Sequence, residues 1–122
     1  MPEYKISQSE LDVMEAIWQA GGWLSAHDVI ARLSDSKKWK YTTVATFLTR
    51  LKEKGFLEQD KRGTSNVYRA AVSKEAYKEE ETQAFVASIH HGSKKSLMAS
   101  LYGGKLTDAE LDELIRWVET RE

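Results

Sequence analysis

The stretch that decides the fold is residues 39–69, WKYTTVATFLTRLKEKGFLEQDKRGTSNVYR. Its first part has apolar residues at helical spacing and reaches Gly55, which predicts a helix capped by Thr42 or Thr43. Two strand-like segments follow, Phe56–Asp60 and Val67–Val72, and the turn-forming run KRGTSN between them predicts a β-hairpin. A short helix followed by a hairpin is the layout of a winged helix-turn-helix.

Two further helices are predicted before this stretch. Ser7 and Glu10 have the spacing of a capping box, and the helix they begin should end at Gly21-Gly22. Ser25 gives a second capping signal, after a brief extended segment at Trp23-Leu24. The predicted fold is therefore mainly α with a small β-hairpin: a winged helix-turn-helix in residues 1–72 and a helical dimerisation region in residues 73–122.

Charge is segregated along the chain although the net charge is only −1. Residues 1–31 hold one basic and five acidic residues, which gives −4, and residues 70–122 hold seven basic and ten acidic, which gives −3. Residues 32–69 hold ten basic and four acidic residues, which gives +6. A basic block of this kind is typical of a phosphate-binding surface, although lysine and arginine also serve as ordinary solvated side chains.

A helical wheel places the predicted third helix with one apolar and one polar face. The apolar face holds Val44, Phe47, Leu48 and Leu51. The opposite face is small, hydroxylated and basic, with Thr43 and Ala45 at its margins, and consists of Thr42, Thr46, Thr49 and Arg50. Such a face suits a helix that enters a major groove, where threonine can contact phosphates or bases and arginine can pair with guanine. The alternative is an amphipathic helix with an idle polar face.

Residues flanking this helix extend the predicted DNA-binding surface. Lys61 and Arg62 should lie at the tip of the wing, where charge is also common in proteins that bind no DNA. Lys37 and Lys38 could contact the backbone, and Tyr4 and Tyr68 are weaker candidates. The residues predicted to contact DNA are Lys40, Tyr41, Thr42, Thr43, Thr46, Thr49, Arg50, Lys61 and Arg62. The four tryptophans are expected to be structural, with Trp23 in a hydrophobic staple.

The C-terminal fifty residues are predicted to form three helices. Ser73 should cap the first, which runs to about His91, and Thr107 with Glu110 forms a capping box for the last. A segment this small buries little apolar surface alone, so we predict a homodimer. Its interface should contain Phe85, Ile89, Leu97, Leu101, Leu111, Leu114, Ile115 and Val118. The alternative is that these helices fold back onto the first 72 residues.

Other function classes find little support in the composition. The chain has no cysteine, so thiolate metal sites and cysteine nucleophiles are excluded. His90-His91 lacks the spacing of a chelating pair, because adjacent side chains on a helix diverge. No phosphate-binding glycine loop or nucleophile motif occurs. We expect no enzyme activity, no cofactor, no metal and no membrane span, and a cytoplasmic location because the N-terminus does not resemble a signal peptide.

The chain resembles the BlaI/MecI penicillinase-repressor family. The resemblance rests on ISQSELDVMEAIW at residues 6–18, WKYTTVATFLTRLKEKGFL at residues 39–57, and YRAAVS at residues 68–73. It implies a dimeric winged-helix repressor bound to a pseudo-palindromic operator. By the motif match, the contacts from the recognition helix would come from Thr42, Thr43, Thr46 and Arg50. Relatives often carry a long or basic side chain where this chain has Ala45.

The resemblance also bears on regulation. In β-lactam-responsive members a protease cuts an Asn-Phe bond in the dimerisation region, and this position falls near Ser100-Leu101, where the residues differ. A regulatory protease is therefore a candidate partner. Copper-responsive members use a C-terminal cysteine motif, which this chain lacks. The competing hypothesis for the whole chain is a winged-helix module that binds an acidic protein partner rather than DNA.

Overall fold

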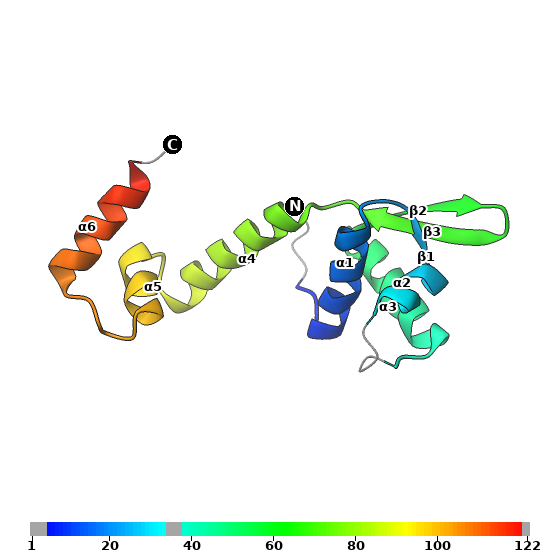
Figure 1. The fold of residues 1–122 in the computed structure, drawn as a ribbon, viewed down its shortest axis with the longest axis horizontal. Helices are drawn as coiled ribbons and strands as arrows, with labels where there is room; N and C mark the ends of the chain where they lie inside the picture. The colour runs from blue at the N-terminus through cyan, green and yellow to red at the C-terminus, as the bar shows by residue number, and fades with distance from the viewer. Residues whose placement is uncertain (1–4, 34–37, 121–122) are drawn as a thin grey trace. The chain divides into compact units, whose positions relative to one another are not determined.

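The structure is a computed structural model that describes residues 5–33 and 38–120. It is mainly helical with one small antiparallel sheet, as predicted (Figure 1). The elements, in chain order, are α1 (Gln8–Ala20), β1 (Leu24–Ser25), α2 (Ala26–Arg32), α3 (Tyr41–Glu53), β2 (Leu57–Arg62), β3 (Ser65–Ala70), α4 (Lys74–Ile89), α5 (Lys94–Leu101) and α6 (Asp108–Glu119). Within the described residues, none of the helices is both long and apolar enough to cross a membrane.

Most of the predicted side-chain caps of the helices are present in the structure. Ser7 with Glu10, Ser25 with Asp28, and Thr107 with Glu110 each form a reciprocal capping box. Gly21 ends α1 with a φ of 76°, a left-handed conformation that glycine adopts without strain. At the start of α4, the Ala76 N–H donates to the Ser73 hydroxyl at 3.1 Å. Local sequence therefore determines where most helices begin.

The start of α3 differs from the prediction. The helix begins at Tyr41 with Lys40 as its N-cap, and Lys40 contributes no side-chain hydrogen bond. The Lys40 carbonyl accepts the N–H groups of Thr43 at 3.0 Å and Val44 at 3.2 Å, so the first turn is closed by backbone alone. Thr42 and Thr43 therefore lie inside the helix and cap nothing, and their side chains are left for other contacts.

The predicted hairpin is present, but its strands are shifted. Gly55, with a φ of 85°, ends α3, and the Phe56 N–H donates back to the Leu51 carbonyl at 2.9 Å, so β2 begins one residue later than predicted. Arg62 pairs with Ser65, which leaves Gly63-Thr64 as a two-residue turn. The strand order is β1-β3-β2, with β3 in the centre.

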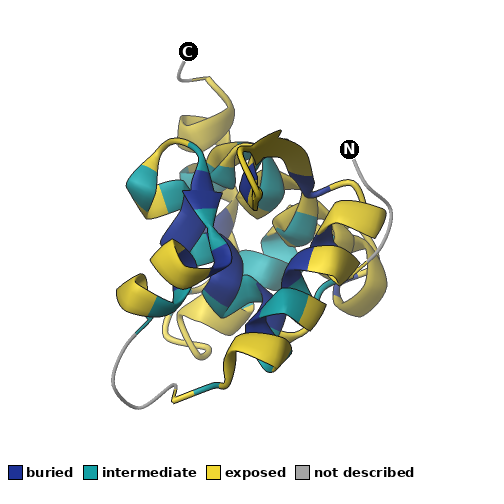
Figure 2. Ribbon diagram, turned by 90° about the vertical axis from the view of Figure 1, so that its right-hand side faces the viewer, coloured by how far each residue is buried: buried dark blue, intermediate teal, exposed yellow. Residues whose placement is uncertain are grey.

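The core of the winged part lies between α1, α2, α3 and one face of the sheet. Its buried members, dark blue in Figure 2, come from every one of these elements. They are Val13, Met14, Ala16, Ile17, Leu24, Ala26, Val29, Val44, Leu48, Leu51, Phe56, Leu57 and Tyr68. Three of them, Val44, Leu48 and Leu51, form the inner stripe of α3 and are completely inaccessible to solvent. Burying this stripe fixes the rotation of α3 about its axis.

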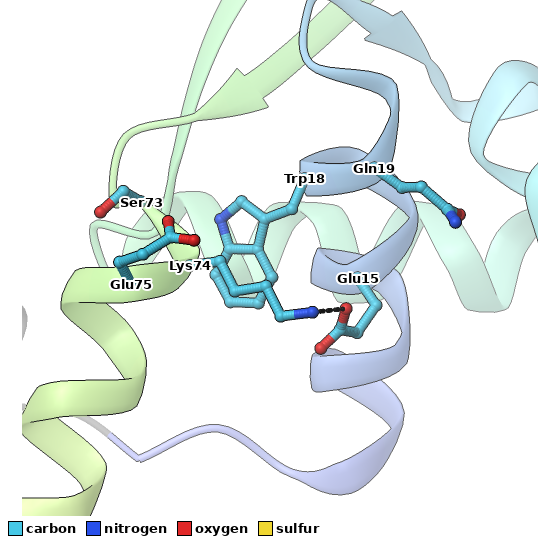
Figure 3. Close-up of a pocket in the computed structure, with 6 residues that line it drawn as sticks. All are labelled: Glu15, Trp18, Gln19, Ser73, Lys74 and Glu75. Carbon is cyan, nitrogen blue, oxygen red and sulfur yellow. Dashed lines mark hydrogen bonds and ion pairs between the residues drawn. The ribbon is translucent and has the colours of Figure 1, made fainter.

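The first turn of α4 packs with the winged part, and the compact unit accordingly runs from Met1 to Tyr77. The Tyr77 ring lies 5.6 Å from Trp18 and 5.9 Å from Phe56. The Trp18 indole N–H donates to the Val72 carbonyl at 2.8 Å. Lys74 pairs with Glu15 at 2.9 Å across a surface pocket of about 420 Å³ (Figure 3). The division of function at residues 72 and 73 stays a prediction.

The second compact unit, Lys78–Glu122, has little interior of its own. Leu111 is buried, and the buried His90 ring lies 2.7 Å from the Ser96 hydroxyl through Nδ1. Helices α5 and α6 are linked by ion pairs from Lys94 to Glu119 at 2.9 Å and from Lys95 to Asp112 at 3.2 Å. Helix α4 has no buried residue, and Phe85, Ile89, Leu101, Tyr102, Trp117 and Val118 are exposed in this unit.

One buried ion pair connects α1 to the end of α3. Glu10 is 3% exposed, and its two carboxylate oxygens accept hydrogen bonds from Lys54 Nζ at 2.9 and 3.0 Å. Lys54 also donates to the Lys5 carbonyl at 3.1 Å. Burial acts to raise the pKa of Glu10, but hydrogen bonds with Ser7 and Lys54, together with the charge of Lys54, outweigh it and hold the pKa below its ordinary value of 4.5.

We predict that Glu10→Gln lowers the free energy of unfolding by about 1–3 kcal/mol at neutral pH, because Lys54 loses its charged partner in a partly buried site. Urea unfolding of both proteins measures the difference. Since folding depresses the pKa of Glu10, its stabilisation is full above 4.5, the ordinary value, and is lost as the pH falls through the lower folded value. The two unfolding curves should therefore converge in acid.

The control is Glu15→Gln, which breaks the half-exposed pair with Lys74 and should cost at most about 1 kcal/mol. Equal losses in the two variants, or a Glu10→Gln deficit that persists unchanged in acid, would contradict the assigned role of the buried pair.

Candidate nucleic-acid interface

Helix α3 presents the polar face that the sequence predicts. Thr42, Thr46, Thr49 and Arg50 are exposed, directly opposite the buried stripe of Val44, Leu48 and Leu51. Thr43 and Ala45 lie at the margins and are half-buried. The side chains on this face before Arg50 are no larger than threonine. Its small side chains would let the helix backbone approach another surface closely.

The hydroxyl groups on this face have a defined chemistry. Thr46 donates to the Thr42 carbonyl at 2.9 Å, and Thr49 donates to the Ala45 carbonyl at 3.0 Å. With their hydrogens used inside the helix, both hydroxyl oxygens remain acceptors, and both residues are exposed. The face therefore suits base edges that offer an amino donor or a thymine methyl better than it suits phosphate.

The N-terminal end of α3 meets the start of α2 and the wing. The Tyr41 ring, which is half-exposed, lies 4.7 Å from the His27 ring. A polar pocket of about 320 Å³ opens beside them, lined by Ser25, Ala26, His27, Tyr41, Ala45, Thr49, Thr64, Ser65, Asn66 and Tyr68. Burial, with a smaller effect of Tyr41, raises the pKa of Tyr68, so its phenol stays neutral. His27 was missed by sequence reasoning, because only the tertiary fold brings it to Tyr41.

Lys61 and Arg62 end β2 at the tip of the wing, as predicted, but they lie on opposite faces of the hairpin. Lys61 pairs with Asn66 and Arg62 with Ser65, and successive side chains of a strand point to opposite sides. Tyr68 lies on the same face as Lys61, which is the face that packs toward α3. The two cations are therefore presented on different faces of the wing.

Trp23 does not form the predicted hydrophobic staple. Its ring is covered instead by two guanidinium groups, with the Arg69 carbon 4.6 Å and the Arg62 carbon 5.5 Å from the ring centroid. The staple prediction was wrong because the residue adjoining the Ser25 cap is Leu24, which enters the core and leaves Trp23 beside the sheet.

Several cations on this side of the molecule are available to a ligand. Across the described ranges, Lys40, Arg50 and Lys61 make no ion pair with a carboxylate, whereas Lys54 and Arg69 are engaged by Glu10 and Glu58. Lys38 is exposed just before α3, while Lys37 and Tyr4 lie outside the described residues. Of these cations, Lys40 is the N-cap of α3 and Arg50 lies on its exposed face.

Four of the eight predicted dimer residues are exposed in the second unit. Phe85 is 49%, Ile89 60%, Leu101 69% and Val118 52% exposed, and Leu97, Leu114 and Ile115 are half-buried. Leu111 differs from the others: at 3% exposed it packs inside its own unit, and its place in an interface stays a prediction. Ser100 and Leu101 are both exposed at the end of α5.

His90 and His91 show no arrangement for a metal. Within the described residues there is no group of three histidine, aspartate, glutamate or cysteine side chains that could hold an ion. His90 is buried beside Phe85 with its ring against Ser96, and His91 has a φ of 52° in the turn that follows α4. His90 therefore has a packing role within its own unit.

Comparison with known proteins identifies the family. The penicillinase repressor family model matches residues 6–120. The penicillinase repressor of Bacillus licheniformis is 31% identical over 116 residues, covering 94% of this chain and 90% of that protein. The methicillin resistance regulatory protein MecI of Staphylococcus aureus (strain N315) is 30% identical over 112 residues, covering 91% of this chain and 90% of that protein.

Solved structures agree on the DNA-binding fold. The DNA-binding domain of the repressor BlaI matches with a TM-score of 0.53 and 36% identity, covering 60% of this chain and 88% of that one. Monomeric Bacillus licheniformis BlaI in complex with the blaP half-operator matches with a TM-score of 0.51 and 35% identity, covering 61% and 89%. Because the family model extends over nearly the whole chain and the relatives are similar over nine-tenths of it, the chain belongs to the penicillinase repressor family.

Proposed function

We propose that this chain is a transcriptional repressor that binds operator DNA through α3 and the wing. The observation that carries the proposal is the outward face of α3, where Thr42, Thr46, Thr49 and Arg50 are exposed. Within the part of the chain that the structure describes, Arg50 and Lys40 form no ion pair with a carboxylate. Membership in the penicillinase repressor family and the likeness to a BlaI structure in complex with a half-operator support it.

In the proposed complex α3 enters the major groove. Thr42 and Thr46 supply methyl groups and hydroxyl acceptors to base edges, and Arg50 reaches a guanine or clamps a phosphate. Lys40, Tyr41 and the α3 N-terminus contact the sugar-phosphate backbone, with Thr43 beside them. Lys61 and Arg62 contact flanking backbone from the wing. Phosphate contacts set the register of the protein, and contacts from α3 read the sequence.

We further propose that the protein acts as a homodimer through its second unit. Phe85, Ile89, Leu101 and Val118 are large apolar side chains exposed to solvent, and isolated helices of this size gain stability by burying them against a second copy. A twofold dimer would hold two α3 helices about one helical turn of DNA apart, or a multiple of it, and would match a pseudo-palindromic operator.

Release by a regulatory protease remains part of the proposal. Ser100 and Leu101 stand at the exposed end of α5, next to the proposed interface residues, so a cut there would weaken dimerisation. A repressor of this kind needs neither a cofactor nor an enzyme activity. Because a repressor of this kind acts on chromosomal DNA, we propose a cytoplasmic location in a bacterial cell.

The first test measures DNA selection and its dependence on Arg50. Full-length protein is used to select fragments from the genomic DNA of its source, and fluorescence anisotropy then gives the affinity for a selected duplex. A dimer that makes several phosphate contacts should lose about 10³-fold or more in affinity between about 50 and 200 mM salt. Arg50→Ala should weaken specific binding by about 1–3 kcal/mol if Arg50 contacts a base.

Lys52→Ala is the matched control, because Lys52 is an exposed cation on the same helix but outside the proposed surface. It should bind nearly as tightly as the unaltered protein. An unchanged affinity of Arg50→Ala would remove Arg50 from the interface. The absence of both sequence preference and salt dependence would favour the protein-binding module instead.

The second test concerns the dimer. Ile89→Glu combined with Val118→Glu places charge on two exposed apolar positions and should convert the full chain to a monomer in sedimentation velocity. Operator affinity should fall with it, because one half-site is then bound alone. Gln83→Glu, an exposed position on α4, is the control and should remain dimeric. A charged double variant that stays dimeric would refute this placement of the interface.

A further inference from the structure

Trp23 is the one aromatic side chain of the sheet region whose ring is paired with two cations. It lies immediately before β1 and is half-buried. The guanidinium carbons of Arg69 and Arg62 lie 4.6 and 5.5 Å from its centroid, both within the distance of a cation–π interaction. Tryptophan is the aromatic residue that attracts cations most strongly, and arginine can lie flat on it.

The strand register shows which face of the wing this cluster covers. Glu58 pairs with Arg69 and Arg62 pairs with Ser65, so Glu58, Arg62 and Arg69 share one face of the hairpin. Lys61 lies on the opposite face, with Asn66 and with Tyr68, which is buried in the core. The Trp23 cluster therefore occupies the face of the wing opposite to Lys61 and Tyr68.

The two arginines on Trp23 are held differently. Arg69 donates from Nε to Glu58 at 2.9 Å, and Arg69 Nη2 lies 2.9 Å from the same carboxylate oxygen. Arg62 has no carboxylate partner among the described residues, so its N–H groups remain available. A guanidinium group that lies over an aromatic ring keeps its in-plane N–H donors free. The Arg62 guanidinium group thus lies against the Trp23 ring, while its N–H groups have no carboxylate partner among the described residues.

We propose that Trp23 is a positioning residue for DNA binding. It holds the Arg62 side chain extended from the last residue of β2, so that the guanidinium edge meets a backbone phosphate flanking the α3 site. An arginine on an edge strand beside a glycine turn would otherwise lose much side-chain entropy on binding. Stacking on Trp23 removes part of that loss before DNA arrives. This inference rests on the proposed function.

A double-mutant cycle on the full-length protein tests the inference. Trp23→Leu, Arg62→Gln and the double variant are titrated against the selected duplex and against a random-sequence duplex of equal length, over a series of salt concentrations. Each single variant should reduce the slope of log affinity against log salt by about 1 for each wing bound. Each should bind both duplexes about five- to tenfold more weakly per wing at about 0.1 M salt, since phosphate contacts carry no sequence information. The double variant should lose nothing further.

Lys61→Gln supplies the matched control within the wing. Lys61 lies on the other face, so adding Lys61→Gln to Trp23→Leu should produce an additional, independent loss. Arg62→Lys keeps the charge but not the planar group, and should bind more weakly than the unaltered protein. This variant leaves the core untouched, so it carries the test even if unfolding curves show that Trp23→Leu is not folded at the assay temperature.

Three outcomes would overturn the inference: an unchanged salt slope in folded Trp23→Leu, losses that add fully between Trp23→Leu and Arg62→Gln, or an Arg62→Lys variant that binds as well as the unaltered protein. If any of these occurs while Arg50→Ala still weakens binding, the repressor function stands and the role of Trp23 alone fails. If the unaltered protein shows neither sequence preference nor salt dependence on DNA, both fail together.

Discussion

The burial of one apolar stripe on α3 is the constraint on which the rest of the arrangement depends. Val44, Leu48 and Leu51 are fully buried, and a helix with one buried stripe can present only the opposite face to a ligand. The Glu10–Lys54 pair ties the C-terminal end of α3 to the first turn of α1, and Gly55 turns the chain directly into the wing. The packing of the buried side of α3 therefore sets the positions of the hydroxyl groups, of Arg50 and of the wing.

Much of this could be predicted from sequence because it rests on local rules. The three capping boxes, the inner and outer faces of α3, and the hairpin all follow from periodicity and from residue types at short spacing. The start of α3 was misplaced because the Lys40 carbonyl, and not a threonine hydroxyl, closes its first turn. Backbone capping of this kind leaves no signal in side-chain identity.

The features that sequence reasoning missed depend on residues distant along the chain. Trp23 lies beside Arg62 and Arg69 only because β1 pairs with β3, and His27 meets Tyr41 only because α2 packs on α3. The burial of Leu111 within its own unit was also not predicted, because an apolar position on α6 does not reveal which surface covers it. Periodicity identifies an apolar face but does not name its partner. The exposed apolar side chains of the second unit and the available cations of the first belong to one proposal. In it, dimerisation through the second unit allows two DNA-binding surfaces to bind one operator together.

Nuclear magnetic resonance spectroscopy of the full-length protein, titrated with a duplex that it selects from genomic DNA, tests the central claim most directly. The account predicts that the largest amide shifts map to Thr42, Thr46 and Arg50, with a second set at Lys61 and Arg62, while Glu15 and Lys74 on the α1–α4 pocket remain unchanged. Shifts concentrated around Glu15 and Lys74, with α3 unperturbed at saturating DNA, would contradict it.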